Sequence, residues 1–590
     1  MRASRTLRVF CLSVLSIAVW AQTPSGDQAA QAKGNTEDLQ QLRERIAKQE
    51  EQIKRLQESI DEQKTLLQKA VQGLPAPGAA NVSPAPAPMP AAPSAPATAG
   101  LPVTPGSPAK IVPVSNIPVR NVANTRYAQH NENAPPSPLS ISLGNTTLTP
   151  LGFMDATFFW RSTAIGSGIG TNFPGAPFNN VPNGHLSETN FSAQNSRIGF
   201  RVDSTFMGWK VLGYLESDFL FNNDANSFQI TSNSAGLRLR NYFVDLNNGE
   251  FEMLGGQDWS FLTPNRKGLS PLPSDIFYSQ NMDTNYQVGL VWSRAPQFRF
   301  IAHPNENVAF GVALENPQQY IGGGNGSGAV TIPSFLNGQS TFTGQFQSSP
   351  GSNVGNEITN VPNLMPNIIP KVAFDGKVGD RTMHLELAGV VAGYKDYIPN
   401  TSTFTANPYV RVGSHSQFGF GGELNSNLEL FKNFHLIENV YVSSGVGRYL
   451  FGMAPDVAIR PDGTLSPIHS AGTVDGFEYQ VTPNNLFAVY YGGVYVGRNV
   501  IYDPTASGST LAKPVYAGYG FTGSGGTQNR DVQEITFDWV RTLWKNQNYG
   551  ALSTITQYSY LFREPWYTSN SIPRQAHSNM IWLDLRYTLP

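Results

Sequence analysis

The last eleven residues of the chain, Met580 to Pro590, alternate between two kinds of side chain. The first set is Ile581, Leu583, Leu585, Tyr587 and Leu589, and the second is Trp582, Asp584, Arg586 and Thr588. A period of two places the two sets on opposite faces of a β-strand. At the end of an exported chain, this pattern predicts the closing strand of an outer-membrane β-barrel, whose strands alternate lipid-facing and lumen-facing residues.

The N-terminus predicts export. Arg2, Arg5 and Arg8 precede an apolar run from Val9 to Trp20 and a small residue, Ala21, which is the layout of a signal peptide over residues 1–21. The alternative is an N-terminal membrane anchor, but a run of about a dozen apolar residues is shorter than the ~20 that a spanning helix needs.

Composition and motifs exclude several classes of protein. The only cysteine, Cys11, lies in the signal peptide, so the mature chain offers no disulfide and no cysteine metal site. The eight histidines are scattered singly, and we find no hydrolase or phosphate-loop motif. We therefore predict no catalytic residue, no cofactor and no metal. A formal net charge of -2 argues against nucleic acid as a partner.

A short polar lead (22–35) precedes a predicted coiled coil (36–70). Leu39, Ile46, Ile53, Ile60 and Leu67 occupy a positions of five heptads, and Leu42, Gln49, Leu56, Gln63 and Ala70 occupy d positions. The alternative is a single amphipathic helix packed on a domain, but the stripe is only two positions wide. The heptads favour self-association, and they leave dimer and trimer open because glutamine interrupts the d positions.

Residues 71–138 predict a linker. Thirteen prolines, mostly accompanied by alanine, lie between Leu74 and Pro118. Such a segment forms neither a sheet nor a packed core, so we expect an extended spacer. Binding of a proline-recognising or cell-wall partner is the alternative.

Residues 139–590 repeat short alternating segments between Gly, Asn, Pro and Ser clusters. In Arg197–Asp203, for example, Ile198, Phe200 and Val202 oppose Arg197, Arg201 and Asp203. Seventeen such segments can be marked, the further ones centred near Phe158, Leu215, Leu239, Phe251, Leu290, Phe300, Phe310, Phe374, Leu385, Phe420, Val440, Phe477, Val489, Phe537, Ile555 and Leu585. A barrel with both chain ends on one side has an even number of strands. We therefore predict an all-β transmembrane barrel of about 16 antiparallel strands, and expect the surplus segment between Asn285 and Glu315.

Two connections are unusual. Ser260 to Asp283 carries Arg266 and Lys267 and is predicted to fold inward as a constriction loop. Asn316 to Pro366, with Gly322 to Gly328 at its centre, is too long for a periplasmic turn and is predicted to lie outside the cell.

Four arginines fall on polar faces of neighbouring strands: Arg197, Arg201, Arg238 and Arg240. Guanidinium groups in a narrow passage attract carboxylates and hold them with two hydrogen bonds, so these residues are candidate solute contacts in the lumen. The same faces carry Asp203, Glu216 and Asp218, and the alternative is structural ion pairing with little selectivity. For Arg586 and Asp584 we predict mutual pairing.

Leu237-Arg-Leu-Arg-Asn-Tyr-Phe-Val-Asp245 and Gly255-Gly-Gln-Asp-Trp259, together with the preceding coil and spacer, resemble the DcaP-like outer-membrane porins. The resemblance implies a homotrimer in the outer membrane with a periplasmic α-helical coiled coil, and a channel that favours dicarboxylates or other small organic anions. The chain departs from barrels of this kind at its terminus, Leu589-Pro590, where an aromatic residue is common.

We therefore expect a porin whose partners are outer-membrane lipid and small anionic solutes. The alternative is a structural tether, with a closed barrel and a coil that binds peptidoglycan. A secreted β-sandwich adhesin would leave the outward Phe, Leu and Trp rows in water, which is unfavourable.

Overall fold

The computed structural model describes residues 137–221, 236–272, 282–317, 321, 330–346, 361–451, 453–569 and 571–590. The predicted signal peptide (1–21), polar lead (22–35) and coiled coil (36–70) lie outside these ranges. The same holds for the predicted linker (71–138), except for its last two residues.

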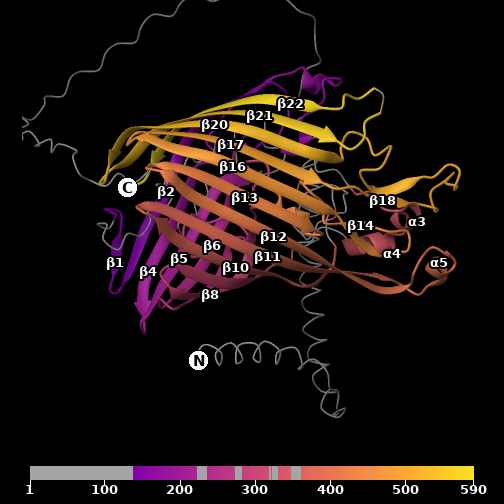
Figure 1. Cartoon of the computed structure of the whole chain (residues 1–590), viewed down its shortest axis with the longest axis horizontal. Helices are drawn as coiled ribbons and strands as arrows, with labels where there is room; N and C mark the ends of the chain where they lie inside the picture. The colour runs from indigo at the N-terminus through magenta and orange to yellow at the C-terminus, as the bar shows by residue number, and fades with distance from the viewer. Residues whose placement is uncertain are drawn as a thin grey trace, which may run out of the picture. The chain divides into compact units, whose positions relative to one another are not determined.

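The described residues form one antiparallel sheet that closes on itself (Figure 1). Its eighteen strands are β1 (Ile141–Leu143), β2 (Thr146–Arg161), β3 (Glu188–Ser192), β4 (Arg197–Phe206), β5 (Trp209–Phe221), β6 (Gly236–Asn247), β7 (Phe251–Trp259), β8 (Arg294–Asn305), β9 (Val308–Glu315), β10 (Asn363–Val378), β11 (Arg381–Ile398), β12 (Gly413–Phe431), β13 (Phe434–Ser444), β16 (His469–Thr482), β17 (Asn485–Val496), β20 (Asn529–Asn546), β21 (Gly550–Pro565) and β22 (Ala576–Thr588). The short strands β1 and β3 pair only with β2, so the other sixteen form the ring. Pairing of β2 with β22, from Phe153 with Thr588 to Arg161 with Met580, closes it.

The predicted number of strands is confirmed, and the surplus segment is the one centred near Leu290. The segments near Phe300 and Phe310 are β8 and β9. Leu290 lies outside any strand and is fully buried, because its segment runs inside the barrel. An apolar run that packs against the interior carries the same composition as a buried strand, which explains the error.

The alternation predicted for the last strand holds in β22. Leu583 and Leu585 are each 46% exposed, whereas Trp582, Asp584 and Arg586 are buried. Large apolar side chains are also exposed on the outer face of other strands, among them Phe200, Leu237, Phe298, Leu387, Phe420 and Val442. An apolar exterior of this extent fits lipid rather than water, and closure leaves no unpaired strand edge within it.

The two ends of the barrel differ. At the end that carries the C-terminus, neighbouring strands are joined by short turns, for example Met207-Gly208 between β4 and β5. The opposite end carries the long connections (Figure 1), which hold α3 (Ser334–Asn337), α4 (Ser340–Thr343), α5 (Ser402–Thr405), β14 (Val457–Ile459), β15 (Leu465–Pro467), β18 (Asn499–Tyr502) and β19 (Tyr516–Tyr519). Among the residues described, no helix is long and apolar enough to cross a membrane.

The long connection of residues 316–366 is described at 330–346, and its glycine-rich centre lies outside the described residues. The backbone of Thr331 exchanges two hydrogen bonds with Gly518 of β19 (2.9 and 3.1 Å). Phe335 packs edge to face on Phe404 of α5, with 6.0 Å between ring centroids. This part of the connection therefore packs on its neighbours at the long-loop end.

Candidate functional site

The connection between β7 and β8 folds into the barrel, and we call it the inner loop (residues 260–293, described at 260–272 and 282–293). Its buried apolar side chains are Phe261, Leu262, Leu269, Met282, Val288 and Val291. They share one core with inward-facing residues of the wall, such as Ile369 of β10 and Ile555 of β21. The described part of the segment that was predicted as a constriction loop, residues 260–272, 282 and 283, therefore lies inside the barrel.

Carboxylates on the wall hold the backbone of the inner loop. Backbone N–H groups of the loop donate hydrogen bonds to four wall carboxylates. The donors and acceptors are Phe261 N to Glu315 of β9 (2.6 Å), Asn265 N to Glu386 of β11 (3.2 Å), Gly268 N to Asp375 of β10 (2.9 Å) and Val288 N to Glu534 of β20 (3.1 Å). A loop inside a barrel pairs with no strand edge, so its N–H groups need other acceptors. The inward-facing carboxylates supply them, three on the neighbouring strands β9, β10 and β11 and one on β20.

Asp283 stabilises the returning half of the inner loop. Its Oδ1 accepts the backbone N–H of Thr171 (3.0 Å) and that of Asn285 (2.9 Å). Burial raises the pKa of the Asp283 carboxyl above its ordinary value, although the charge of Arg161 opposes this shift.

Gly492 of β17 allows the inner loop to lie directly on the wall. A Cβ at this position would come within 1.9 Å of the carbonyl oxygen of Val288. Gly289, on the loop side, has φ +85°, and its Cβ would lie 2.2 Å from the carbonyl oxygen of Thr473. Because Gly492 and Gly289 carry no side chains, the backbone of the inner loop can lie directly against the backbone of the wall.

A second segment, between β13 and β14, also reaches the interior. Tyr449 is buried, and its hydroxyl donates to Glu315 (3.2 Å) and accepts from Asn367 (2.8 Å). Burial and the Glu315 carboxylate raise the pKa of Tyr449 well above its ordinary value, so the hydroxyl remains a donor. Phe451 stacks on Trp292 of the inner loop, with 4.8 Å between ring centroids. The sequence did not predict this second inward segment.

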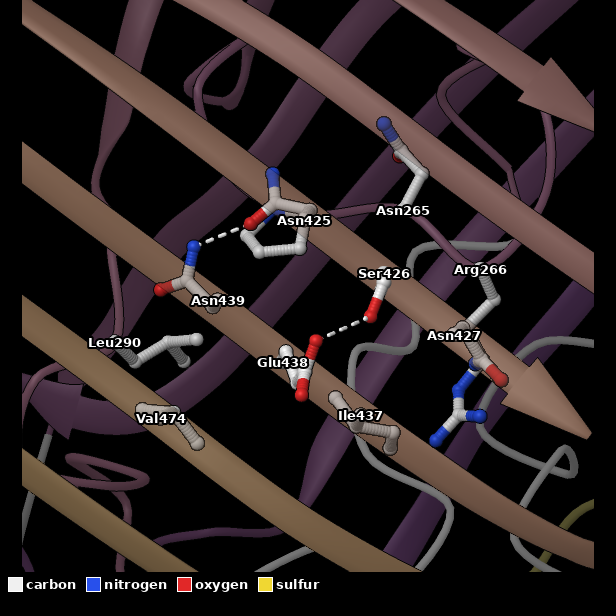
Figure 2. Close-up of a pocket in the computed structure, with 11 residues that line it drawn as sticks. Asn265, Arg266, Leu290, Asn425, Ser426, Asn427, Ile437, Glu438, Asn439 and Val474 are labelled. Atoms are coloured by element: carbon white, nitrogen blue, oxygen red, sulfur yellow. Dashed lines mark hydrogen bonds between the residues drawn. The ribbon is translucent and has the colours of Figure 1, made fainter. Parts of the chain in front are cut away.

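The contact between the inner loop and β12, β13 and β16 leaves little room (Figure 2). Asn265, Arg266 and Leu290 of the loop line a pocket together with wall residues that include Asn439. Its volume is about 10 Å³, roughly the room that one water molecule requires. This side of the loop is therefore packed against the wall.

Three of the four predicted arginines meet at two carboxylates. Asp218 binds Arg238 (Nη2–Oδ2 2.7 Å) and Arg240 (Nη1–Oδ2 2.7 Å). Glu216 binds Arg240 (Nε–Oε1 2.5 Å) and Arg197 (Nη1–Oε1 3.3 Å). We call these five residues the arginine cluster. All are buried except Arg238, whose side chain is 35% exposed.

A β-bulge places Arg240 in this cluster. Glu216 of β5 pairs with Asn241 and Ser217 pairs with Leu239, so Arg240 is an extra residue in β6. Arg240 and Asn241 are therefore both buried, although simple alternation would send one outward. A strict period of two in the sequence does not predict this bulge.

The other predicted site residues lie apart from the arginine cluster. Arg201 pairs with Asp203 two residues further along β4 (2.7 Å). Arg266 pairs with Glu478 of β16 (2.7 Å), and Lys267 is exposed. Most of the predicted cations thus have carboxylate partners, the arrangement that structural ion pairing requires.

Sequence reasoning missed three residues beside the arginine cluster. Tyr286 accepts a hydrogen bond from Arg197 Nη2 (3.4 Å). Trp259 packs on Tyr286 and on Trp292, and Arg294 lies over the Trp259 ring. Trp259 stood in a motif that suggested the family, but nothing in the sequence indicated that its ring lies inside the barrel. Arg294 precedes an alternating segment and shows no periodic signal.

The predicted pair of Arg586 and Asp584 is only a minor contact. Arg586 instead binds Asp155 of β2 with two hydrogen bonds of 2.6 Å, and the closest approach to Asp584 is 3.8 Å. Adjacent strands bring Asp155 directly opposite Arg586 in register. Cross-strand pairing therefore replaces the pairing expected along the strand.

No protein-family model and no curated protein matches the sequence. Solved structures do match. The chain resembles the outer membrane channel DcaP of Acinetobacter baumannii. The two are 16% identical, the match covers 76% of this chain and 98% of that chain, and the TM-score is 0.49. DcaP gives its name to the family that the motifs of β6 and β7 resemble.

Two other solved structures also match. An anion-selective porin from Comamonas acidovorans is 12% identical, with 75% of this chain and 99% of that chain covered and a TM-score of 0.39. OmpF of Salmonella typhi, in complex with daunomycin, is 8% identical, with 76% and 99% covered and a TM-score of 0.40.

Proposed function

We propose that this protein is an outer-membrane porin through which small hydrophilic solutes diffuse. The closed ring of sixteen strands, with an apolar exterior and a charged interior, carries this proposal. Closure satisfies the backbone hydrogen bonds that lipid cannot, and a barrel of about sixteen strands is wide enough for an aqueous passage. The short turns then face the periplasm, and the long connections face outward.

The solutes are organic anions such as dicarboxylates. Arg197, Arg201, Arg238 and Arg240 form the solute-contacting wall, and Arg266 and Lys267 belong to the constriction loop. The partial exposure of Arg238 and the exposure of Lys267 support this role. A partly dehydrated guanidinium group binds a carboxylate with two parallel hydrogen bonds.

The assembly is a homotrimer anchored in outer-membrane lipid, with the coiled coil in the periplasm. The heptads of residues 36–70 support self-association. Contact between the coil and peptidoglycan fits the length of the spacer that follows it.

Conductance in a planar bilayer under a salt gradient tests the porin function. We expect stepwise currents with anion preference, partial block by added succinate, and weaker preference in Arg238→Ala and Arg201→Ala. Arg411→Ala is the matched control, because its side chain is 71% exposed and lies 4.0 Å from Asp462. Absence of current from folded protein would contradict the porin function.

A structural tether is the second candidate, and the packed interior favours it. The inner loop and the β13–β14 segment meet inside the barrel and share buried contacts with the wall. A tether predicts a barrel without conductance and a coil that binds peptidoglycan. The bilayer measurement and sedimentation of the protein with purified peptidoglycan separate the two functions.

A further inference from the structure

Two wall carboxylates hold the inner loop on either side of residues 266 and 267, an arginine and a lysine that we call the basic tip. On one side, the backbone N–H and the side-chain amide of Asn265 donate to Glu386 of β11 (3.2 and 3.0 Å). On the other side, Gly268 N donates to Asp375 of β10 (2.9 Å). The place of the basic tip therefore depends on where these two carboxylates point.

The imidazole of His384 bridges the same two carboxylates. His384 lies on β11, opposite Asp375 in register, and its side chain is buried. Its Nδ1 lies 2.9 Å from Asp375 Oδ1, and its Nε2 lies 3.1 Å from Glu386 Oε1. A neutral imidazole carries a proton on one nitrogen only, so the other nitrogen would turn a lone pair toward a carboxylate. This geometry therefore fits the doubly protonated imidazolium.

The charges at this bridge balance only while His384 is protonated. Lys371 of β10 binds Glu386 (2.8 Å) and donates to the carbonyl oxygen of Thr263 in the loop (2.9 Å). Lys371 and the imidazolium thus face Asp375 and Glu386, two cations and two carboxylates. All of these side chains except that of Asp375 are buried. An unbalanced charge is costly in such a place, because little water screens it.

Neighbouring groups do not replace the charge of His384 in the described part of the barrel. The other charged or titratable residues of this region are Lys377 of β10, Glu423 and Glu429 of β12, His435 of β13, Glu478 of β16 and Arg266 of the loop. Arg266 binds Glu478 (2.7 Å), and Lys377 is exposed to water. Glu423 is buried near Lys371 and adds negative charge. Loss of the His384 proton would therefore leave an excess of negative charge at the bridge.

We propose that the His384 imidazolium is the positioning residue that keeps the basic tip against the wall, and that loss of its proton at alkaline pH releases the tip into the lumen. Without the bridging proton, Asp375 and Glu386 repel each other and the lone pair of the ring. Their bonds to the loop backbone then weaken together. This inference rests on the proposed porin function, because it names the group that holds the constriction in place.

The distance between two spin labels tests this positioning without reference to conductance. One label is attached at Lys267→Cys in the tip, and the other at Lys432→Cys in the exposed turn between β12 and β13. The full-length chain also carries Cys11→Ser, because Cys11 is its only natural cysteine. We expect a narrow distance distribution at about pH 6 and a broad one at about pH 9.5, a range in which histidine loses its proton while lysine largely keeps its own.

Variants of His384 separate its charge from its packing. His384→Gln removes the charge and should give a broad distribution at both pH values. His384→Lys keeps a positive charge across this range and should give a narrow distribution at both. His415→Gln is the matched control, because His415 also pairs with a carboxylate, Asp396 (2.7 Å), at the long-loop end. It should retain the narrow distribution and its response to pH. Mobility on unheated gels shows that each variant is folded.

Single-channel recording then connects the tip to passage. Current steps of the wild type should become smaller over the same rise in pH, and those of His384→Lys should stay constant. A narrow distribution in folded His384→Gln would overturn the inference, and so would a response to pH that persists in His384→Lys. Broadening that depends on His384 in a barrel without current would support the positioning role and refute the porin function.

Discussion

At the scale of single residues, a buried ion pair crosses the seam of the barrel. Arg586 of β22 donates two hydrogen bonds to Asp155 of β2, and its guanidinium carbon lies 4.1 Å from the centroid of the Phe153 ring. Both charged side chains are buried. A buried charge that loses its partner keeps its desolvation cost without compensation.

Replacing Arg586 by leucine should therefore lower the free energy of unfolding by about 3–5 kcal/mol. The loss reflects the uncompensated Asp155 carboxylate rather than missing volume. Urea titration in detergent, followed by tryptophan fluorescence and by mobility on unheated gels, measures it.

Arg530→Gln is the control for that experiment. Arg530 also pairs with two carboxylates, Asp531 and Glu564, but its side chain is 38% exposed. Exposed pairs contribute roughly 0–1 kcal/mol, so this variant should unfold close to the wild type. Equal stability of both variants would refute a special role for the pair at the seam.

Single residues also show how far sequence reasoning reaches. The period of two placed Arg586, Arg197 and Arg240 inside the barrel before any partner was known. It could not name the partners. Arg586 and Asp155 are 431 positions apart in the chain, and only the register of the closing strands brings them together.

At the scale of elements, the inner loop determines how much of the lumen remains free. It crosses from β7 to contacts on β10, β11, β16 and β20 before it returns to β8. Its close approach to the wall at Gly492 depends on the absence of a side chain. Conductance should therefore respond to small changes at this position.

Gly492→Ala should displace the inner loop from the wall into the lumen and lower the conductance of single steps. The new Cβ would lie 1.9 Å from the Val288 carbonyl oxygen, so the loop must move away from β17. The overpacking should also lower the free energy of unfolding by about 1–3 kcal/mol. Single-channel recording and urea titration measure the two effects.

Gly493→Ala provides the matched control on the same strand. Its added Cβ would meet the Tyr491 hydroxyl at 3.2 Å, and that flexible side chain can yield. We expect conductance close to that of the wild type. Identical currents from both variants would show that the inner loop does not limit passage.

The elements that sequence failed to predict share a physical cause. The sequence near Leu290 predicts a strand because apolar residues of a loop packed inside a barrel resemble those of a buried strand. The bulge at Arg240 breaks the period by a single residue, which no composition indicates. The inward β13–β14 segment depends on contacts with Glu315 and Trp292, both far away in sequence.

At the scale of the whole molecule, the barrel closes by itself. The ring of sixteen strands is complete within residues 146–588. Within the described residues, every strand of the ring pairs with two others of the ring. In the proposed function, the predicted coiled coil (36–70) serves the assembly of subunits, and the barrel forms the passage.

The heptads allow a test, in the full chain, of whether the coil serves subunit assembly while the barrel forms the passage. Ile46→Asn combined with Ile53→Asn places two polar residues at a positions, where self-association requires apolar contact. We expect the oligomer to dissociate at lower temperature on unheated gels, while the size of single current steps stays unchanged. Glu51→Gln combined with Glu58→Gln changes f positions, which face away from the seam, and should leave the oligomer intact. If the a-position variant instead kept its oligomer, self-association would reside in the barrels, and the coil would be left with binding to the cell wall.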